Sequence, residues 1–166
     1  LRHWNVSDIL SLTRMNEDEE VMRYFLSTMN AEQSKAFYDR VQRHFDQHGF
    51  GLFVVENKKS KAFMGYTGFM IAEFESDFTP CIEIGWRFQK EFWGHGFATE
   101  AANACLEYGF NVLDFDTIHS FTSVLNHKSE AVMKRIGMVL TGTFGHPKIS
   151  NEHPLHLHVK YSIHKN

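Results

Sequence analysis

The hydrophobic positions of this chain change their spacing along the sequence, and each change predicts a different element. Over residues 81–88 apolar and polar side chains alternate, which is the period of a strand with two different faces. From Ala98 onward small residues recur at i, i+3, i+4 and i+7, which predicts a helix that lies close to a sheet. A glycine turn at residues 93–97 separates the two segments. We expect this strand, turn and helix to form the centre of the fold.

The same patterns predict the other elements. One expected helix covers residues 6–13, with Ser7 or Asp8 as its cap, and the acidic run 17–20 is expected to open another. A third is expected over residues 30–47, from a capping box at Asn30 and Gln33 to a stop at Gly49. A further helix is expected over residues 126–136. The expected strands cover residues 51–56, 63–71, 81–88, 117–124, 138–144 and 155–163, and residues 1–4 have the pattern of the end of another. The short polar linker 57–61 predicts an antiparallel hairpin. This order predicts an α/β fold, a mixed sheet with helices on both faces.

Composition narrows the class of protein. The chain has 166 residues, of which 43% are hydrophobic and 22% charged, so one globular domain over residues 1–166 is expected. A net charge of -3 gives no electrostatic reason to expect a nucleic acid or an anionic membrane as a partner. Cys81 and Cys105 have no metal or redox spacing and no signal peptide is visible, so a cytoplasmic location is expected. Because the sequence starts without Met, we also expect that several native residues precede Leu1.

The glycine turn and the helix that follows it have the features of an anion-binding site. The first N–H groups of a helix lack partners within the helix, the helix dipole is positive there, and glycines let a ligand approach the backbone. A phosphate loop of nucleotide hydrolases is excluded because no Gly-Lys-Ser or Gly-Lys-Thr follows Gly96. A dinucleotide fingerprint needs a third glycine, and only Gly94 and Gly96 are present. A plain tight turn remains the alternative interpretation of these two glycines.

The longer string EIGW…WGHGFATEA, from Glu83 to Ala101, resembles the acetyl-CoA-binding motif of the GNAT acetyltransferase superfamily. It looks most like the branch that contains the ribosomal-protein N-terminal acetyltransferases, and the resemblance extends over nearly the whole chain. It implies a single α/β domain (α+β in some schemes) with a mostly antiparallel sheet of about seven strands. It also implies direct transfer of an acetyl group from acetyl-CoA to a primary amine. A catalytically idle CoA-binding sensor or scaffold of the same fold is the alternative.

The resemblance implies which residues hold the coenzyme. The end of the strand pairs with the pantetheine arm through Trp86, Arg87 and Phe88, and the Phe88 N–H polarises the thioester carbonyl. Glu91 stands where the family often has Gln or Arg, so the anion site is expected to be slightly less positive. Backbone N–H groups of the turn and the helix start hold the pyrophosphate, and the residues concerned are Trp93, Gly94, His95, Gly96, Phe97, Ala98 and Thr99.

Asn126 and Ser129 form a second constellation. From their spacing alone, Asn126 caps the next helix and Ser129 lies in its first turn. In the family that this chain resembles, the Asn binds the pantetheine arm and the Ser lies near the thioester sulfur. Many members also carry a Tyr where this chain has Met133, which cannot donate a proton. A thiol with a pKa of about 8.5 leaves readily near neutrality. We therefore expect Ser129 to stabilise the departing thiolate.

Glu83 is the candidate general base. It lies on the central strand at positions opposite in parity to Ile84 and Trp86, and a solvated position on a half-exposed strand is the alternative. In the family an acidic residue on this strand often accepts the acceptor's proton through water. An α-amine with a pKa near 8 needs less help than a lysine with a pKa near 10.4. We read Glu100 as a structural residue of the first helical turn.

The chain contains 11 histidines, and His156 and His158 share one face of a predicted strand. Even with His153 nearby, no further ligand has compelling spacing, so we expect no metal. The acceptor is expected to be a small molecule or a protein N-terminus, bound by a monomer or a homodimer. Segments 15–35, 73–80 and 144–154 are expected to build its pocket, and the sequence leaves its identity open.

Overall fold

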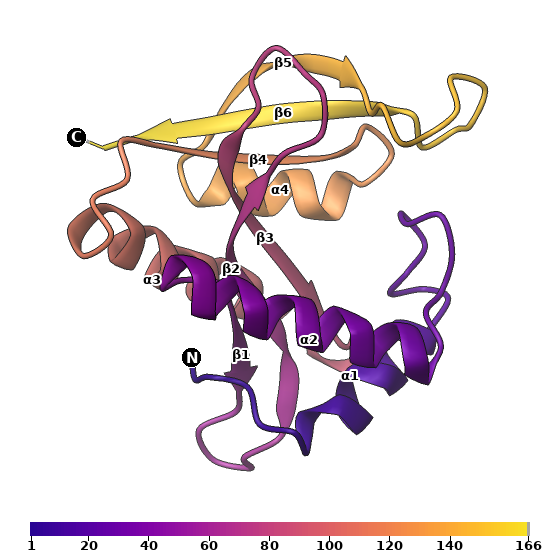
Figure 1. The fold of residues 1–166 in the computed structure, drawn as a ribbon, viewed down its shortest axis with the longest axis vertical. Helices are drawn as coiled ribbons and strands as arrows, with labels where there is room; N and C mark the ends of the chain where they lie inside the picture. Colours follow the sequence, from indigo (N-terminus) through magenta and orange to yellow (C-terminus); the bar gives the residue numbers. More distant parts are fainter. Residues whose placement is uncertain (166) are drawn as a thin grey trace.

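A computed structural model describes residues 1–165, and within them it contains four α-helices and six strands (Figure 1). The helices are α1 (Asp8–Glu17), α2 (Ala31–His48), α3 (Phe97–Asn111) and α4 (His127–Arg135), and a short 3-10 turn covers Lys90–Phe92. The strands are β1 (Leu52–Glu56), β2 (Phe63–Ala72), β3 (Cys81–Phe88), β4 (Thr117–Ser123), β5 (Val139–Gly145) and β6 (Leu157–His164).

The strands form one mixed sheet in the order β1-β2-β3-β4-β6-β5. All neighbours are antiparallel except β3 and β4, which are parallel and share a single register pair, Glu83 with His119. Figure 1 shows β1–β3 and β4–β6 as two sets of strands that meet at β3 and β4 and then run in different directions. The two halves of the sheet therefore separate at the carboxyl end of β3.

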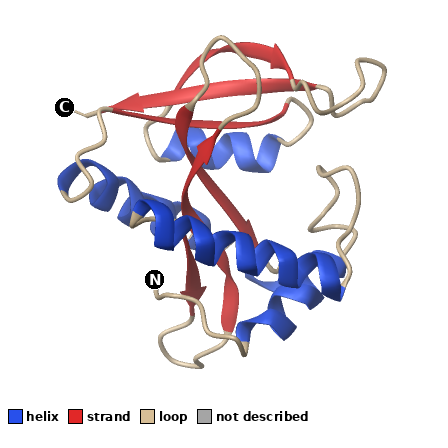
Figure 2. Ribbon diagram, in the orientation of Figure 1, coloured by secondary structure: helices blue, strands red, loops and turns tan. Residues whose placement is uncertain are grey.

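The alternating pattern of β3 places its side chains on two opposite faces. Figure 2 shows helices on both sides of the sheet. Ile84 lies on the face of α3 and α4, in a buried cluster to which these helices contribute Ala102, Cys105, Leu106, Val132 and Met133. Glu83 and Arg87 lie on the other face. There β2 packs against α1 and α2, and Tyr66, which pairs with Arg87, is buried with Leu12, Phe37 and Val41. The predicted sheet with helices on both faces is confirmed.

The structure has six strands within residues 1–165, and the prediction of about seven was too high by one. Residues 1–4 make only one isolated antiparallel bridge, in which Arg2 and Val54 exchange N–H···O bonds of 3.0 and 2.9 Å. The chain then turns away, because the Asp8 carboxylate accepts hydrogen bonds from the Asn5 N–H at 2.7 Å and from the Arg2 guanidinium at 2.8 Å. These bonds end the pairing before a strand can form.

The prediction that the acidic run 17–20 opens a helix was wrong. Helix α1 ends at Glu17, and the Asp18 carboxylate accepts hydrogen bonds from the N–H groups of Glu20 at 2.8 Å and Val21 at 3.1 Å. A short acidic side chain that bonds to nearby N–H groups competes with helix formation. The segment from Asp18 onward is therefore a series of turns. Asp8 does not cap α1 either, because its carboxylate is occupied by Arg2 and Asn5.

The predicted capping box of α2 is confirmed. The Asn30 side chain accepts from the Gln33 N–H at 2.9 Å, and the Gln33 side chain accepts from the Asn30 N–H at 2.9 Å. Gly49 ends the helix in the left-handed conformation, with φ of 76°. These two ends fix the length of the helix that covers the Glu83 face.

Replacing Asn30 with Ala should lower the free energy of unfolding by about 1 kcal/mol, because the Gln33 N–H loses its partner. Urea unfolding followed by circular dichroism measures the change. Asn30→Ser should keep most of the stability, since a serine oxygen can also cap. Equal stability of Asn30→Ala and the wild type would show that this box does not stabilise α2.

Candidate active site

The candidate site begins where β3 parts from β4. The Ser120 hydroxyl on β4 donates to the Ile84 carbonyl at 2.9 Å, and the Trp93 indole donates to the Phe88 carbonyl at 2.9 Å. Backbone groups alternate between the two edges of a strand, so the N–H and C=O of Trp86 point to the same edge as those of Ile84 and Phe88, the edge toward β4. Within residues 1–165 the β3–β4 pairing ends at Glu83. The N–H and C=O of Trp86 and the N–H of Phe88 are therefore free, and we call them the open edge of β3.

Arg87 is placed differently from Trp86 and Phe88, with which it was grouped in the sequence. Its backbone faces β2, where it pairs with Tyr66. Its side chain lies on the face of α1 and α2, where Nη1 donates to the Asn16 carboxamide at 2.7 Å. The structure thus brings Trp86 and Phe88 to the open edge and places the Arg87 guanidinium on another side of the strand.

The N-terminus of α3 lies next to the open edge. Phe88 and Ala101 are buried in one cluster, and Trp86, Trp93 and the first residues of α3, Phe97 and Ala98, pack against it. No side chain among the described residues caps α3, and its first backbone bond is Glu100 N–H to Gly96 C=O at 3.0 Å. The N–H groups of Phe97, Ala98 and Thr99 are consequently free to bind an anion.

Gly94 and Gly96 give this helix start its shape. Their φ angles are 78° and 82°, in the left-handed region that favours glycine. A Cβ at either position would have no other described atom within 4 Å, so both glycines border open space. His95, between them, is exposed. The free N–H groups and the space beside them fit a pyrophosphate group.

Lys128 is a feature of the site that the sequence did not reveal. Its Nζ lies 4.4 Å from the centroid of the Trp93 ring, which places a cation from the start of α4 beside the glycine turn. Glu91, by contrast, is exposed. Position 91 thus carries an acid, and the positive charge beside the turn comes from another element. No spacing rule could have found it, because the two segments meet only in the folded chain.

Asn126 and Ser129 occupy the capping geometry predicted from their spacing. The Asn126 Oδ1 accepts from the Ser129 N–H at 3.3 Å, and Nδ2 donates to the Thr122 hydroxyl at 3.0 Å. An amide oxygen has two lone pairs and an amide nitrogen two protons, so one of each stays available. The Ser129 hydroxyl makes no hydrogen bond to any of residues 1–165 and is partly accessible. Met133 is 1% exposed in the core.

Glu83 lies at the point where the β3–β4 pairing ends. Its carboxylate forms no hydrogen bond or ion pair with the part of the chain that the structure describes. Burial raises the pKa of Glu83 to about 8, and the charge of Arg40 offsets this only in part. A carboxyl group whose pKa lies near neutrality is suited to accept a proton from an amine.

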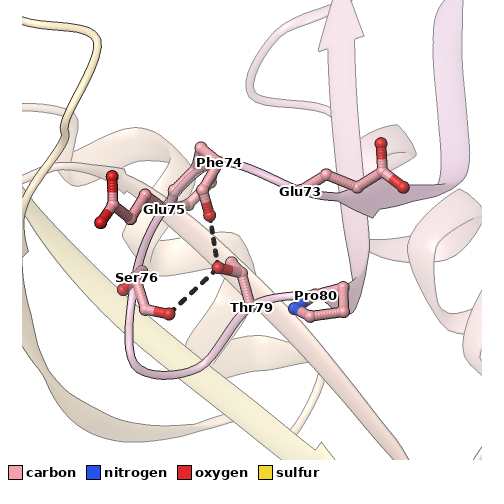
Figure 3. A pocket seen from close by; sticks show the side chains of 6 residues that line it. All are labelled: Glu73, Phe74, Glu75, Ser76, Thr79 and Pro80. Atoms are coloured by element: carbon pink, nitrogen blue, oxygen red, sulfur yellow. Dashed lines mark hydrogen bonds between the residues drawn. The ribbon is translucent and has the colours of Figure 1, made fainter.

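The loop between β2 and β3 holds a surface hollow of about 350 Å³ (Figure 3). In Figure 3 the Thr79 hydroxyl donates toward the carbonyls of Phe74 and Ser76, which closes the loop on itself. The lining consists of Glu73, Phe74, Glu75, Ser76, Thr79 and Pro80. Neither Glu83 nor the N-terminus of α3 contributes to it. This hollow is therefore separate from the groups described above.

Two histidines near the C-terminus, His156 and His158, contact backbone carbonyl groups. The His156 Nδ1 lies 2.8 Å from the Ile149 carbonyl, and the His158 Nδ1 lies 3.1 Å from the His156 carbonyl. Within residues 1–165 no three His, Cys, Asp or Glu side chains come together as a metal site. In the same range, none of the helices has the length and apolar character needed to span a bilayer.

Comparison with known proteins identifies the family. The model of the acetyltransferase (GNAT) domain matches residues 1–139. The uncharacterized protein YkkB of Bacillus subtilis is 33% identical over 121 residues, which cover 73% of this chain and 69% of YkkB. The uncharacterized N-acetyltransferase YnaD of the same organism is 29% identical over 145 residues, covering 87% and 81%. The putative ribosomal N-acetyltransferase YdaF, also from B. subtilis, is 38% identical over 60 residues, covering 36% and 33%.

Solved structures share the fold. A GNAT-family acetyltransferase from Bacillus anthracis has a TM-score of 0.80 and 24% identity, covering 98% of this chain and 92% of its own. Spermidine N-acetyltransferase from Vibrio cholerae, in complex with CoA and spermine, has a TM-score of 0.77 and 20% identity, covering 99% and 94%. The family match over most of the chain confirms the resemblance found in the sequence. The chain belongs to the GNAT acetyltransferase family and is an N-acetyltransferase by class.

Proposed function

We propose that this protein transfers an acetyl group from acetyl-CoA directly to a primary amine on a small molecule or a protein N-terminus. The observation that carries the proposal is the open edge of β3 beside the uncapped N-terminus of α3. The GNAT family uses acetyl-CoA, and the V. cholerae relative in fold was solved with CoA. A cytoplasmic location and a monomer or homodimer remain part of this proposal.

The residues present fit the coenzyme. The N–H groups of residues 94–99 would bind the pyrophosphate, and Lys128 would add positive charge nearby. The Trp93 N–H, which was grouped with them in the sequence, is instead occupied, because it donates to the Lys90 carbonyl at 3.1 Å. The free N–H and C=O of Trp86 would pair with the amides of the pantetheine arm as a neighbouring strand does. The Phe88 N–H would stabilise the negative charge that develops on the thioester oxygen. The spare donor and acceptor of Asn126 would serve the same arm.

Glu83 and Ser129 act at opposite ends of the transfer. Glu83 takes a proton from the acceptor's ammonium group, directly or through water, and so frees the lone pair that forms the new C–N bond. The Ser129 hydroxyl donates a hydrogen bond to the sulfur as the C–S bond breaks. A serine is a weak acid, so its part is to stabilise the thiolate, which later takes a proton from solvent.

Acetyl-CoA binding and turnover test the proposal together. Thermal shift with acetyl-CoA measures binding, and release of free thiol with a panel of amines measures transfer. Stabilisation with thiol release is the expected result. Stabilisation without release from any amine or N-terminal peptide would identify the idle CoA-binding protein instead. No stabilisation would overturn the proposal.

Gly94→Asn should raise the Kd for acetyl-CoA at least about 10-fold, because its side chain fills space meant for the phosphates. Gly49→Asn is the matched control: Gly49 has φ of 76° against 78° for Gly94, with equally open surroundings in the described chain, but ends α2. Asn tolerates this backbone region in both variants. Isothermal titration compares them with the wild type. Equal affinities for all three proteins would remove the glycine turn from the coenzyme site.

Glu83→Gln should lower thiol release about 10²- to 10⁴-fold, the usual effect of losing a general base, while acetyl-CoA still binds. Its effect on stability depends on pH. The folded pKa of about 8 lies above the ordinary glutamate value of 4.5, so the folded state keeps its proton to a higher pH than the unfolded state. The stabilisation is full below pH 4.5 and is lost as the pH rises through 8.

Urea unfolding between pH 5 and 9 measures this. As the pH rises, the free energy of unfolding of the wild type should fall relative to that of Glu83→Gln. One proton can change it by at most about 1.4 kcal/mol per pH unit. Glu100→Gln, on the exposed side of α3, is the control and should follow the wild type. Parallel pH profiles for wild type and Glu83→Gln would mean that the Glu83 pKa is not raised.

Ser129→Ala should reduce kcat about 10- to 100-fold and leave residual activity, since the hydroxyl only stabilises a tolerable leaving group. Asn126 still caps α4 through its bond to the backbone N–H of residue 129, so the fold should be kept. Steady-state thiol release measures kcat. An unchanged kcat would place Ser129 outside the reaction, and complete loss would make it an obligatory acid.

A further inference from the structure

Arg87 carries a buried positive charge without a counter-charge. The residue is 7% exposed, and its Nη1 bonds to the neutral Asn16 side chain. Its Nε is sealed from solvent and has no hydrogen-bond partner in the described chain. Among residues 1–165 no Asp or Glu carboxylate forms an ion pair with it. Such an arrangement is costly, because a buried guanidinium normally pairs with an acid.

Aromatic rings offset only part of this cost. The guanidinium carbon lies 4.1 Å from the ring centroid of Phe25, 5.5 Å from that of Tyr66 and 5.9 Å from that of Phe37. A cation–π contact recovers less free energy than the desolvation of a buried ion costs. Phe25 is itself 44% exposed, so the guanidinium is one side chain away from solvent. A ligand group that enters past Phe25 would reach it.

The strand between Arg87 and Glu83 has space for such a ligand. Both side chains lie on the α1 and α2 face of β3, and Gly85 lies between them. A Cβ at Gly85 would meet no described atom nearer than the Glu83 Oε1, at 4.0 Å. On β2 the residue opposite Gly85 is also a glycine, Gly68. An acceptor lying over Gly85 would thus have the proposed base at one end and a free cation at the other.

The electrostatics of this face select the ligand's charge. Burial raises the pKa of Glu83 and lowers that of Arg87. Arg40 adds a second positive charge near both groups, which offsets part of the first shift and adds to the second. Burial raises the pKa of Tyr66, which lies opposite Arg87 on β2, and the charges of Arg87 and Glu83 act on this pKa in opposite directions. The face therefore attracts an anion and disfavours a polycation.

We infer that the acceptor is a small amine that also carries an oxyanion, a carboxylate or a phosphate, which the Arg87 guanidinium binds while the amine faces Glu83. The guanidinium suits either oxyanion because its planar fork can donate two parallel hydrogen bonds. The inference rests on the proposed function and specifies the substrate class of the same site. It sets this chain apart from a polyamine acetyltransferase.

Matched amines test the inference on the whole chain. Thiol release is compared for amino acids and their decarboxylated amines, for O-phosphoethanolamine and ethanolamine, and for spermidine. In the carboxylate pairs or the phosphate pair, the oxyanion-bearing acceptor should exceed its matched partner at least about 10-fold in kcat/KM, and spermidine should be poor. The carboxylate and phosphate pairs show which oxyanion is used. Equal rates within every pair, or a preference for spermidine, overturns the inference.

The variant Arg87→Met is a second test of the inference. It is suitable because an apolar side chain of similar length often replaces a buried ion without loss of stability. We expect KM for the oxyanion-bearing acceptor to rise about 100-fold with a smaller change in kcat, and the preference within pairs to vanish. Arg87→Lys keeps the charge without the fork and should fall between the two. If Arg87→Met does not fold, Arg87→Lys decides. An unchanged KM in the variant that folds contradicts the inference.

Binding separates this inference from the proposed function. Thermal shift with acetyl-CoA alone reports the coenzyme site, and failure there overturns the proposed function. Thermal shift with CoA plus each amine reports the acceptor site without requiring turnover. Acetyl-CoA binding with no shift from any oxyanion-bearing amine overturns the inference alone. A shift in the wild type that Arg87→Met loses supports it.

Discussion

The early end of the β3–β4 pairing is the constraint on which the rest of this structure depends. Backbone N–H and C=O groups need partners, and a parallel pair that stops at Glu83 leaves those of Trp86 and the N–H of Phe88 without a neighbouring strand among the described residues. The Trp93 indole satisfies the Phe88 carbonyl and ties the glycine turn to the strand. The free edge and the free N–H groups of α3 are thereby held side by side. In the proposed function, an extended ligand with amides and a diphosphate would satisfy both sets at once, which a plain tight turn would not require.

Local signals in the sequence predicted most of the fold. Alternation gave β3 at residues 81–88, and the Asn30–Gln33 box and Gly49 gave the two ends of α2, because each depends on neighbours within a few residues. The acidic run at 17–20 is also a local signal, but the helix start that it predicted does not form. Its charges suit a helix start, but the Asp18 carboxylate found backbone donors that hold a turn. Residues 1–4 do not form the expected further strand for a similar reason, because the Asp8 carboxylate binds the Asn5 N–H and turns the chain away.

The site was only partly predictable. The glycines and the parity of Glu83 follow from spacing, so both could be named from the residues. The raised pKa of Glu83 could not, because it depends on burial beneath helices that are distant in sequence. Lys128 and the Trp93 ring meet only through the packing of α4 beside α3. Arg87 was assigned by its position in a motif, whereas its side chain belongs to the face that Tyr66 and Phe37 share.

The two-residue period of β3 also gives the two faces of this short strand different neighbours. Even-numbered positions such as Ile84 and Phe88 hold the α3 side, while odd-numbered positions such as Glu83 and Arg87 face α1 and α2. In the proposed reaction, substitutions at odd positions would change which amine is accepted and would leave in place the backbone groups assigned to the coenzyme. A lineage built on this strand could diversify its acceptors while inheriting one donor, and a protein engineer could exploit the same separation.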